Sequence, residues 1–193
     1  LKGYFDKKHL YTLRHVGSIL QGHPDMKRTS GIDMTSGSLG NGLGAGIGMS
    51  IAAKIDMKNY KTFVLAGDGE MQEGIIWESI MYAGHLKLDN LVLIIDRNRW
   101  QSCNSIECTI DIEPLSEKLK TFRWDVLIID GHSIAEIVQA LSKSNKDKPL
   151  AIIANTVKGK GISFMEEDNS WHQRAITDNE YQIAISELGG HKF

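Results

Sequence analysis

Two apolar runs, each ending in polar residues, decide the fold: residues 62–70 read TFVLAGDGE and residues 91–98 read LVLIIDRN. Their apolar parts are continuous rather than alternating, which is typical of strands covered on both faces of a parallel sheet. Two later runs, VLII and LAIIA, have the same character. We therefore predict four parallel strands, over residues 62–66, 91–96, 125–129 and 150–156.

Helical patterns fill most of the intervals between these runs. Residues 39–55 and 75–86 place small and apolar side chains at helical spacing. Ser133 followed by Glu136 is a capping-box signature for a helix over residues 134–142. The order predicts an α/β fold, a doubly wound and mainly parallel sheet with helices on both faces. A length of 193 residues fits one domain spanning residues 1–193.

The composition narrows the classes of partner. The 22 basic and 24 acidic residues nearly cancel, which predicts no nucleic-acid or membrane-surface binding. No apolar stretch approaches the roughly 18 residues of a membrane span, and the first residues do not resemble a signal peptide. Cys103 and Cys108 lack a second cluster, which favours reduced thiols in a cytoplasmic protein.

The loops that follow the strands are the expected place for chemistry, because ligands collect at the carboxyl ends of parallel strands. Asp68 lies between two glycines directly after the first strand, and Asn98 follows the next strand 30 residues later. Neighbouring strands would bring both side chains together, and their oxygens are ligands that Mg²⁺ prefers. Gly-Asp-Gly alone also makes ordinary turns, so this pattern leaves both interpretations open.

The same residues resemble a known family. Gly67-Asp68-Gly69, the 30-residue interval and Asn98 are similar to the signature of thiamine-diphosphate enzymes, and the transketolase branch is the most similar. The resemblance extends over almost the whole chain. It is carried further by residues 21–25, 35–42, 67–74, 83–91 and 170–172 and by the glycine pair Gly159 and Gly161.

The resemblance implies two cofactors, Mg²⁺ and thiamine diphosphate. Asp68, Asn98 and the backbone carbonyl of Trp100 match the Mg²⁺ ligands of the family, and Gly69 matches a residue whose amide meets the diphosphate.

Further positions match the surroundings of the cofactor. Gly37 and Leu39 match the loop that meets the aminopyrimidine ring, and Glu73 matches a glutamate network at the contact between subunits. His23 and His172 match histidines that line the cofactor and substrate channel and act on substrate hydroxyls and protons.

Structural alternatives apply to several of these residues. The sequence Gly-His-Pro around His23 usually forms a surface turn, and Trp171 beside His172 is explained equally well as a packing anchor. Glu73 near a helix start is also a partner for the helix dipole, and the glycines of residues 40–48 also suit close helix packing.

The implied reaction is transfer of a two-carbon ketol unit from a ketose or ketose phosphate to an aldose acceptor, as in pentose phosphate metabolism. The family's activating glutamate belongs to a pyrimidine-binding domain, for which we find no sequence here. We therefore expect the cofactor-holding subunit of a split transketolase, whose partner in an oligomer is a C-terminal transketolase subunit. Residues 1–17 resemble the middle of the family's first domain, so its N-terminal part is expected to be missing.

Two other classes of protein stay open. A catalytically inactive scaffold or regulatory protein with the thiamine-diphosphate fold is favoured by that missing part. A plain nucleotide-binding domain is the weaker alternative, because no Gly-x-Gly-x-x-Gly follows a strand and no phosphate-loop lysine motif is present.

Overall fold

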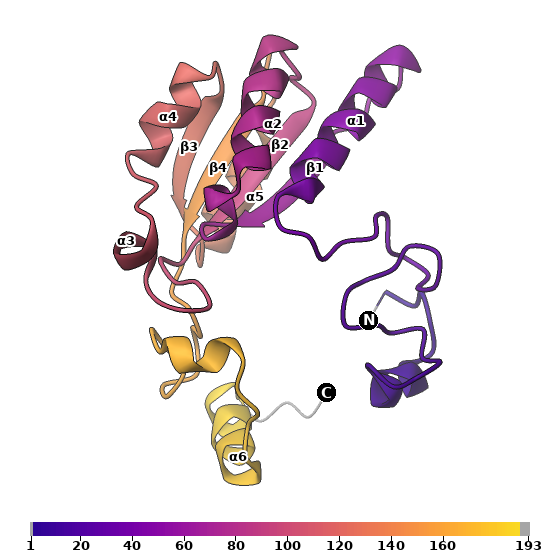
Figure 1. Ribbon diagram of the computed structural model, residues 1–193, viewed down its shortest axis with the longest axis vertical. Helices are drawn as coiled ribbons and strands as arrows, with labels where there is room; N and C mark the ends of the chain where they lie inside the picture. Colours follow the sequence, from indigo (N-terminus) through magenta and orange to yellow (C-terminus); the bar gives the residue numbers. More distant parts are fainter. Residues whose placement is uncertain (1, 190–193) are drawn as a thin grey trace.

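The computed structural model describes residues 2–189 and contains one four-stranded sheet (Figure 1). All three strand pairings are parallel, and the strand order is β1-β2-β4-β3. This confirms the predicted α/β fold with a parallel sheet. The strands are β1 (Thr62–Gly67), β2 (Leu91–Arg97), β3 (Asp125–Asp130) and β4 (Leu150–Asn155).

The strands end level with one another at their carboxyl edge. Gly67 pairs with Asp96, Arg97 pairs with Asn155, and Asn155 also pairs with Asp130. Because the register is flush, the loops that follow all four strands leave the sheet at the same height. The predicted juxtaposition of the loops after β1 and β2 follows from this register.

Helices cover the two faces of the sheet unequally. One face packs against α1 (Asn41–Ile55), α2 (Gly74–His85) and α4 (Leu115–Thr121), and this larger core includes Leu43, Ile80 and Leu119. The other face packs against α5 (Ile134–Ser142), through Ala140 and Leu141. Helices on both faces were predicted, although the second face carries a smaller core.

Close packing explains one glycine of α1. A Cβ on Gly46 would lie 2.4 Å from the Val64 side chain of β1, so α1 approaches the sheet more closely than any other residue would allow. Gly48, half a turn away, has nothing within 4 Å of the same position. The packing interpretation of the glycines therefore holds for Gly46 and not for Gly48.

The helix over residues 134–142 begins as predicted, but its cap differs from a capping box. The Ser133 side chain accepts a hydrogen bond from Glu136 N–H. The Glu136 carboxylate accepts instead from the N–H of Asp130, at the end of β3. A complete capping box occurs at Thr177 and Glu180, where it begins α6 (Asp178–Glu187). Elements that we had not predicted are α4, α6 and the short helices η1 (Lys7–Thr12), η2 (Glu70–Gln72), α3 (Ile106–Thr109) and η3 (Asn169–His172).

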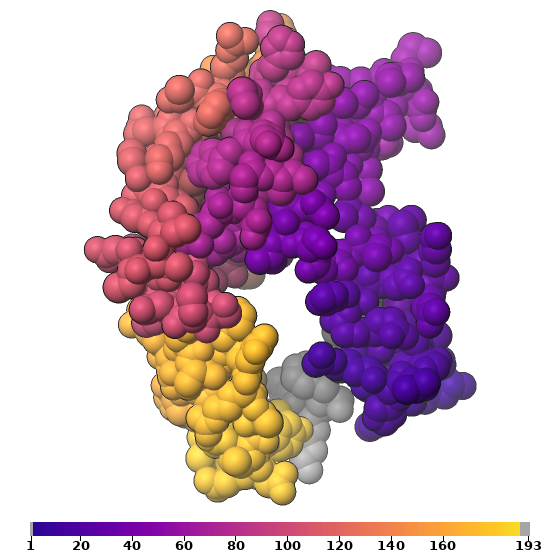
Figure 2. All heavy atoms as spheres, viewed as in Figure 1, coloured from indigo at the N-terminus to yellow at the C-terminus, as the bar shows by residue number. Residues whose placement is uncertain are grey.

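Two terminal segments extend beyond the carboxyl edge of the sheet. Residues 2–40 and residues 156–189 lie on opposite sides below the sheet, and the space-filling view shows an open hollow between them (Figure 2). Between residues 2 and 40 no hydrophobic side chain is buried. None of the helices within residues 2–189 has the length and apolar character needed to cross a bilayer.

Candidate cofactor and metal site

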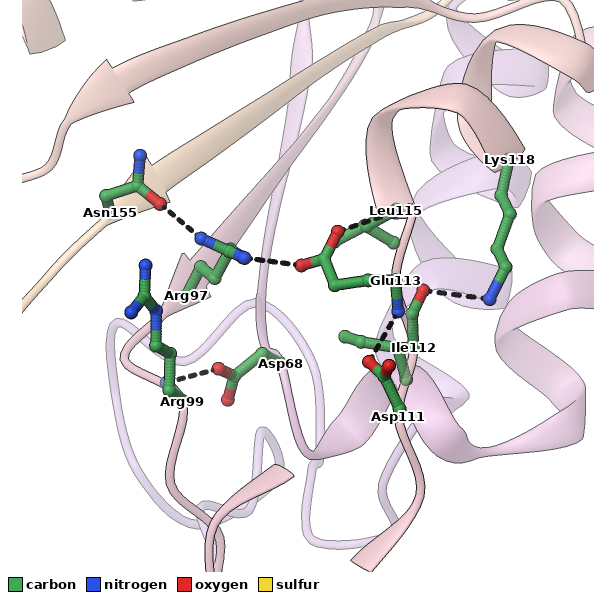
Figure 3. A network of polar contacts seen from close by, with 9 residues as sticks. All are labelled: Asp68, Arg97, Arg99, Asp111, Ile112, Glu113, Leu115, Lys118 and Asn155. Atoms are coloured by element: carbon green, nitrogen blue, oxygen red, sulfur yellow. Dashed lines mark hydrogen bonds and ion pairs between the residues drawn. The ribbon is translucent and has the colours of Figure 1, made fainter. Parts of the chain in front are cut away.

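Asp68 forms the floor of the site. The strand ladder continues for one residue beyond β1, because Asp68 N–H donates to the carbonyl of Asp96 (3.1 Å). The side chain is only 1% exposed. One carboxylate oxygen accepts from Gly69 N–H (2.9 Å) and the other from Arg99 N–H (2.5 Å), the second contact being drawn in Figure 3.

Burial raises the pKa of Asp68 above its ordinary value, while the Arg99 and Gly69 N–H groups act in the opposite direction and the nearby Asp96 carboxylate adds to the rise. Neither amide carries a formal charge, and the Arg97 guanidinium, which also lowers the pKa, does not offset the effect of burial. A bound divalent cation would supply further positive charge, so the surroundings of Asp68 fit a metal ion.

Asn98 follows β2 directly and begins a tight turn. Its side-chain oxygen accepts from Trp100 N–H (2.9 Å), and Arg99 between them has a left-handed backbone with φ of 68°. Arg99 N–H reaches Asp68, so this turn is tied to the loop after β1. Within residues 2–189 no group of three or more His, Cys, Asp or Glu side chains is placed to hold a metal. The predicted ligand set contains only one carboxylate, beside an amide and a backbone carbonyl.

One cavity of about 410 Å³ brings most of the predicted residues together. Of the nine predicted positions, the seven that line it are Leu39, Asp68, Gly69, Glu73, Asn98, Trp100 and His172. These residues come from the segment before α1, the loops after β1 and β2, and the segment after β4. The cavity therefore lies at the carboxyl edge of the sheet, where the strand pattern placed it.

His23 and Gly37 lie outside this cavity. They line a separate pocket formed by the N-terminal segment, where the His23 ring rests against the backbone of Gly37. A Cβ on Gly37 would lie 2.5 Å from His23 Nδ1, and the φ of Gly37 is 137°. The structure thus pairs these two residues with each other rather than with His172.

His172 reaches the cavity from η3 and is exposed. Its Nδ1 lies 3.4 Å from Nζ of Lys158. The neighbouring Trp171 donates to the carbonyl of Phe164 (2.9 Å) and carries the Arg174 guanidinium 4.1 Å from its ring centroid. Trp171 is therefore a packing anchor, as the structural alternative held, and it fixes the short helix that presents His172.

Gly69 and Glu73 both lie in the turn between β1 and α2. The N–H of Gly69 donates to the side chain of Asp68 (2.9 Å). A Cβ at this position would lie 3.0 Å from Cβ of Gln101, so the glycine keeps space free. Glu73 occupies the N-cap position of α2, but its side chain makes no capping hydrogen bond.

The cavity is also lined by residues that we had not selected as site residues, among them Lys158, Glu70 and Gln101. Glu70 joins two loops, because its carboxylate accepts from Gly40 N–H (2.6 Å) and Gly67 N–H (3.3 Å). The Oε1 atom of Gln101 is buried without a hydrogen-bond partner within the described residues. Lys158 follows β4 in a Lys-Gly-Lys-Gly loop, and its position after a strand was the available signal.

Comparison with known proteins agrees with this geometry. The family described as "Transketolase, thiamine diphosphate binding domain" matches residues 1–192. The chain is 42% identical over 190 residues to an apulose-4-phosphate transketolase subunit of Phocaeicola vulgatus, covering 97% of this chain and 67% of that protein. It is also 42% identical over 190 residues to the 6-deoxy-6-sulfo-D-fructose transketolase subunit SqwG of a Clostridium species, with 97% and 69% covered.

A solved structure shows the same arrangement. The transketolase of Campylobacter jejuni superimposes with a TM-score of 0.88 at 30% identity, over 94% of this chain and 30% of that one. The chain thus spans about two thirds of the two relatives named above and under a third of that transketolase. From the matched family, the relatives and the shared fold, we conclude that this chain belongs to the transketolase thiamine diphosphate binding domain family.

Proposed function

We propose that the chain is the thiamine-diphosphate- and Mg²⁺-binding subunit of a two-chain transketolase. The observation that carries the proposal is the buried Asp68 carboxylate, which lines the same cavity as Asn98, Lys158 and His172. The oxygens of Asp68 and Asn98 suit a metal ion, and the positive charge of Lys158 suits the diphosphate bound to it.

In this proposal the metal is held by Asp68, Asn98 and the backbone carbonyl of Trp100. Lys158 lines the same cavity and supports binding of the diphosphate by its positive charge. Leu39 lines it from the segment before α1 and offers an apolar contact to a cofactor ring. Glu70 holds that segment against the end of β1 through Gly40.

Thiamine diphosphate, when bound, supplies the nucleophile and electron sink that cleavage of a carbon–carbon bond beside a carbonyl requires. The protein's own contribution is to bind, orient and transfer protons. His172 is exposed, lines the cavity and lies with its Nδ1 atom beside Nζ of Lys158. A neutral imidazole accepts a proton from a substrate hydroxyl and returns it later in the reaction. His23 is proposed for the same channel, reached from the N-terminal segment.

A partner chain is part of the proposal. Two of the similar proteins are named as subunits, and this chain carries large apolar side chains on its surface. In the N-terminal segment the exposed ones are Tyr4, Leu10, Tyr11, Leu13, Val16, Met26 and Leu39. An apolar surface of this kind suits a permanent contact with a pyrimidine-binding chain in an oligomer.

The experiment measures ketol transfer from a ketose donor to an aldose acceptor with the chain alone, the partner polypeptide alone and the mixture. We expect activity in the mixture only, dependent on Mg²⁺ and thiamine diphosphate. Substantial activity of this chain alone would contradict the two-chain arrangement. A stable mixture that neither binds the cofactor nor transfers ketol units would favour the inactive scaffold.

A further inference from the structure

A polar network lies beside Asp68, and its centre is Arg97 (Figure 3). Asp68, Arg97 and Glu113 line a second cavity, of about 520 Å³. Arg97 is the last residue of β2 and immediately precedes Asn98. Its Nε and Nη2 atoms lie 2.8 and 2.6 Å from the same oxygen of Glu113. Its Nη1 atom donates to the side-chain oxygen of Asn155 (2.9 Å). The guanidinium therefore uses all three of its nitrogens on two partners.

The two partners belong to different elements. Asn155 ends β4, the strand that pairs with β2. Glu113 precedes α4, and its second oxygen accepts from the N–H of Leu115, the first residue of that helix (2.8 Å). On the far side of this loop, Nζ of Lys118 donates to the carbonyl of Ile112 (2.9 Å). Arg97 thus joins the ends of two strands to a helix start that is itself fixed.

Stability alone is a weak explanation for this network. The Arg97 side chain is 23% exposed and that of Glu113 is 40% exposed, and ion pairs with such access to water contribute little to folding. The guanidinium group is planar and carries several N–H donors, so one arginine contacts two groups in fixed directions. Such a contact fixes orientation more than it adds free energy.

Arg97 adjoins the turn that contains Asn98 and Trp100, and its contacts fix the orientation of this turn. On the cavity side this turn is attached through Arg99 N–H to Asp68. Arg97, at the base of this turn, links it through its side chain to both β4 and the start of α4. Backbone contacts add to this, because Ile106 N–H donates to the Arg99 carbonyl (2.9 Å) and Thr156 N–H donates to the Arg97 carbonyl (3.2 Å). We propose that Arg97 is a positioning residue for the metal site. Through Glu113 and Asn155 it holds the Asn98 oxygen and the Trp100 carbonyl where Mg²⁺ and the diphosphate are bound. This inference rests on the proposed function.

The test compares Arg97→Met and Arg97→Lys with Lys54→Met in the full chain mixed with its partner. Lys54→Met is the matched control, because it breaks the 2.6 Å contact with Asp89 at the amino edge of the sheet. Calorimetric titration with thiamine diphosphate and Mg²⁺ should show about tenfold weaker binding for Arg97→Met, the usual scale for residues that orient metal ligands. Arg97→Lys should bind the cofactor almost as weakly as Arg97→Met, because an ammonium group cannot contact Glu113 and Asn155 in the same fixed directions. Lys54→Met should bind like the unmodified protein.

A second measurement needs no cofactor. Hydrogen exchange of the Arg99 and Trp100 amides, which donate to Asp68 and Asn98, should be faster in Arg97→Met than in Lys54→Met. If Arg97→Met does not fold, Glu113→Gln keeps the side-chain size and should show both effects to a smaller degree.

Three outcomes would overturn the inference. Unchanged affinity and unchanged exchange in the Arg97 variants would show that the network does not position the turn. Equal losses in Lys54→Met would show a general effect of stability. Failure of the unmodified protein to bind the cofactor would overturn the proposed function together with the inference. If the unmodified protein binds the cofactor and the Arg97 variants bind it equally well, only the inference is overturned.

Discussion

The sheet with its helices and the two terminal segments contribute different parts of the same cavity. Asp68 and Asn98 belong to the core, at strand ends whose positions are fixed by the flush register. Lys158 and His172 come from the segment after β4, and Leu39 comes from the segment before α1. Asp68 is buried, whereas His172 and Leu39 are exposed.

In the proposed function, this difference assigns metal binding to the core and contact with the substrate to the terminal segments. A core with many buried contacts holds ligands in place without help from the cofactor. The terminal segments bury few apolar groups, with Ala184 the one buried hydrophobic residue between 156 and 189. Their final positions are expected to depend on the partner chain. Changes in the core should therefore alter affinity and stability, and changes in the segments should alter rate.

The largest effect is expected at the floor of the cavity. Asp68→Ala removes the buried carboxylate and should weaken Mg²⁺-dependent cofactor binding by about 3–5 kcal/mol, the scale for removing one partner of a buried charge pair. Asn98→Ala should have the same direction and a smaller size, because it removes a neutral ligand. Calorimetry on the assembled protein measures both. Asp89→Ala, which breaks the contact with Lys54 at the other edge of the sheet, is the control. Unchanged affinity in both site variants would remove the metal assignment.

The next effect concerns the segments. His172→Ala and His23→Ala should lower turnover of the assembled enzyme by about 10²-fold if each histidine transfers a proton. Their melting temperatures should stay unchanged, since both side chains are exposed. His85→Ala is the control, because His85 is exposed at the far end of α2.

The two histidine variants also test the architecture. His23 lies against Gly37 outside the main cavity, so its loss of rate depends on the N-terminal segment meeting the substrate in the assembly. A variant that melts early while its folded fraction keeps full activity would show a structural role for that histidine.

Much of the core was predictable because continuous apolar runs identify buried parallel strands. The four predicted strands match β1 to β4 to within one residue at each end. The proximity of Asp68 and Asn98 also followed, since parallel strands deliver their carboxyl ends to one edge. Roles for these residues remain proposals, because the sequence and the geometry locate side chains without showing what they bind.

Features that depend on tertiary contacts were harder to predict. Glu136 follows Ser133 at the capping-box interval, yet the end of β3 competes for its carboxylate through Asp130 N–H. The helix α4 is short, and its start is stabilised from outside by Glu113 rather than by a capping residue. The separation of His23 from His172 was not predictable, because residues 2–40 lack the periodic pattern that would have placed them.

A third prediction compares packing inside the core. Gly46→Ala should lower the free energy of unfolding by about 1–3 kcal/mol, because its Cβ would overlap the Val64 side chain. Thermal or urea unfolding of the chain measures this change. If Gly46→Ala were neutral, α1 would be as loosely held as the terminal segments, and the contrast between core and segments would fail.

The smallest effect is expected at Gly48, two residues further along the same helix. It is exposed, and an added Cβ would have nothing within 4 Å. Alanine loses less backbone entropy than glycine on entering a helix, so Gly48→Ala should raise the free energy of unfolding by about 0.5–1 kcal/mol. The opposite signs at Gly46 and Gly48 would show that α1 is tight on its sheet side and open on the other. The unfolding experiment must use the chain without its partner, since a second chain packed on the open side would meet the new methyl group. A stabilised lone chain that assembles less well with its partner would place the contact between the two chains on this side of α1. A destabilised lone chain would contradict the open packing at Gly48.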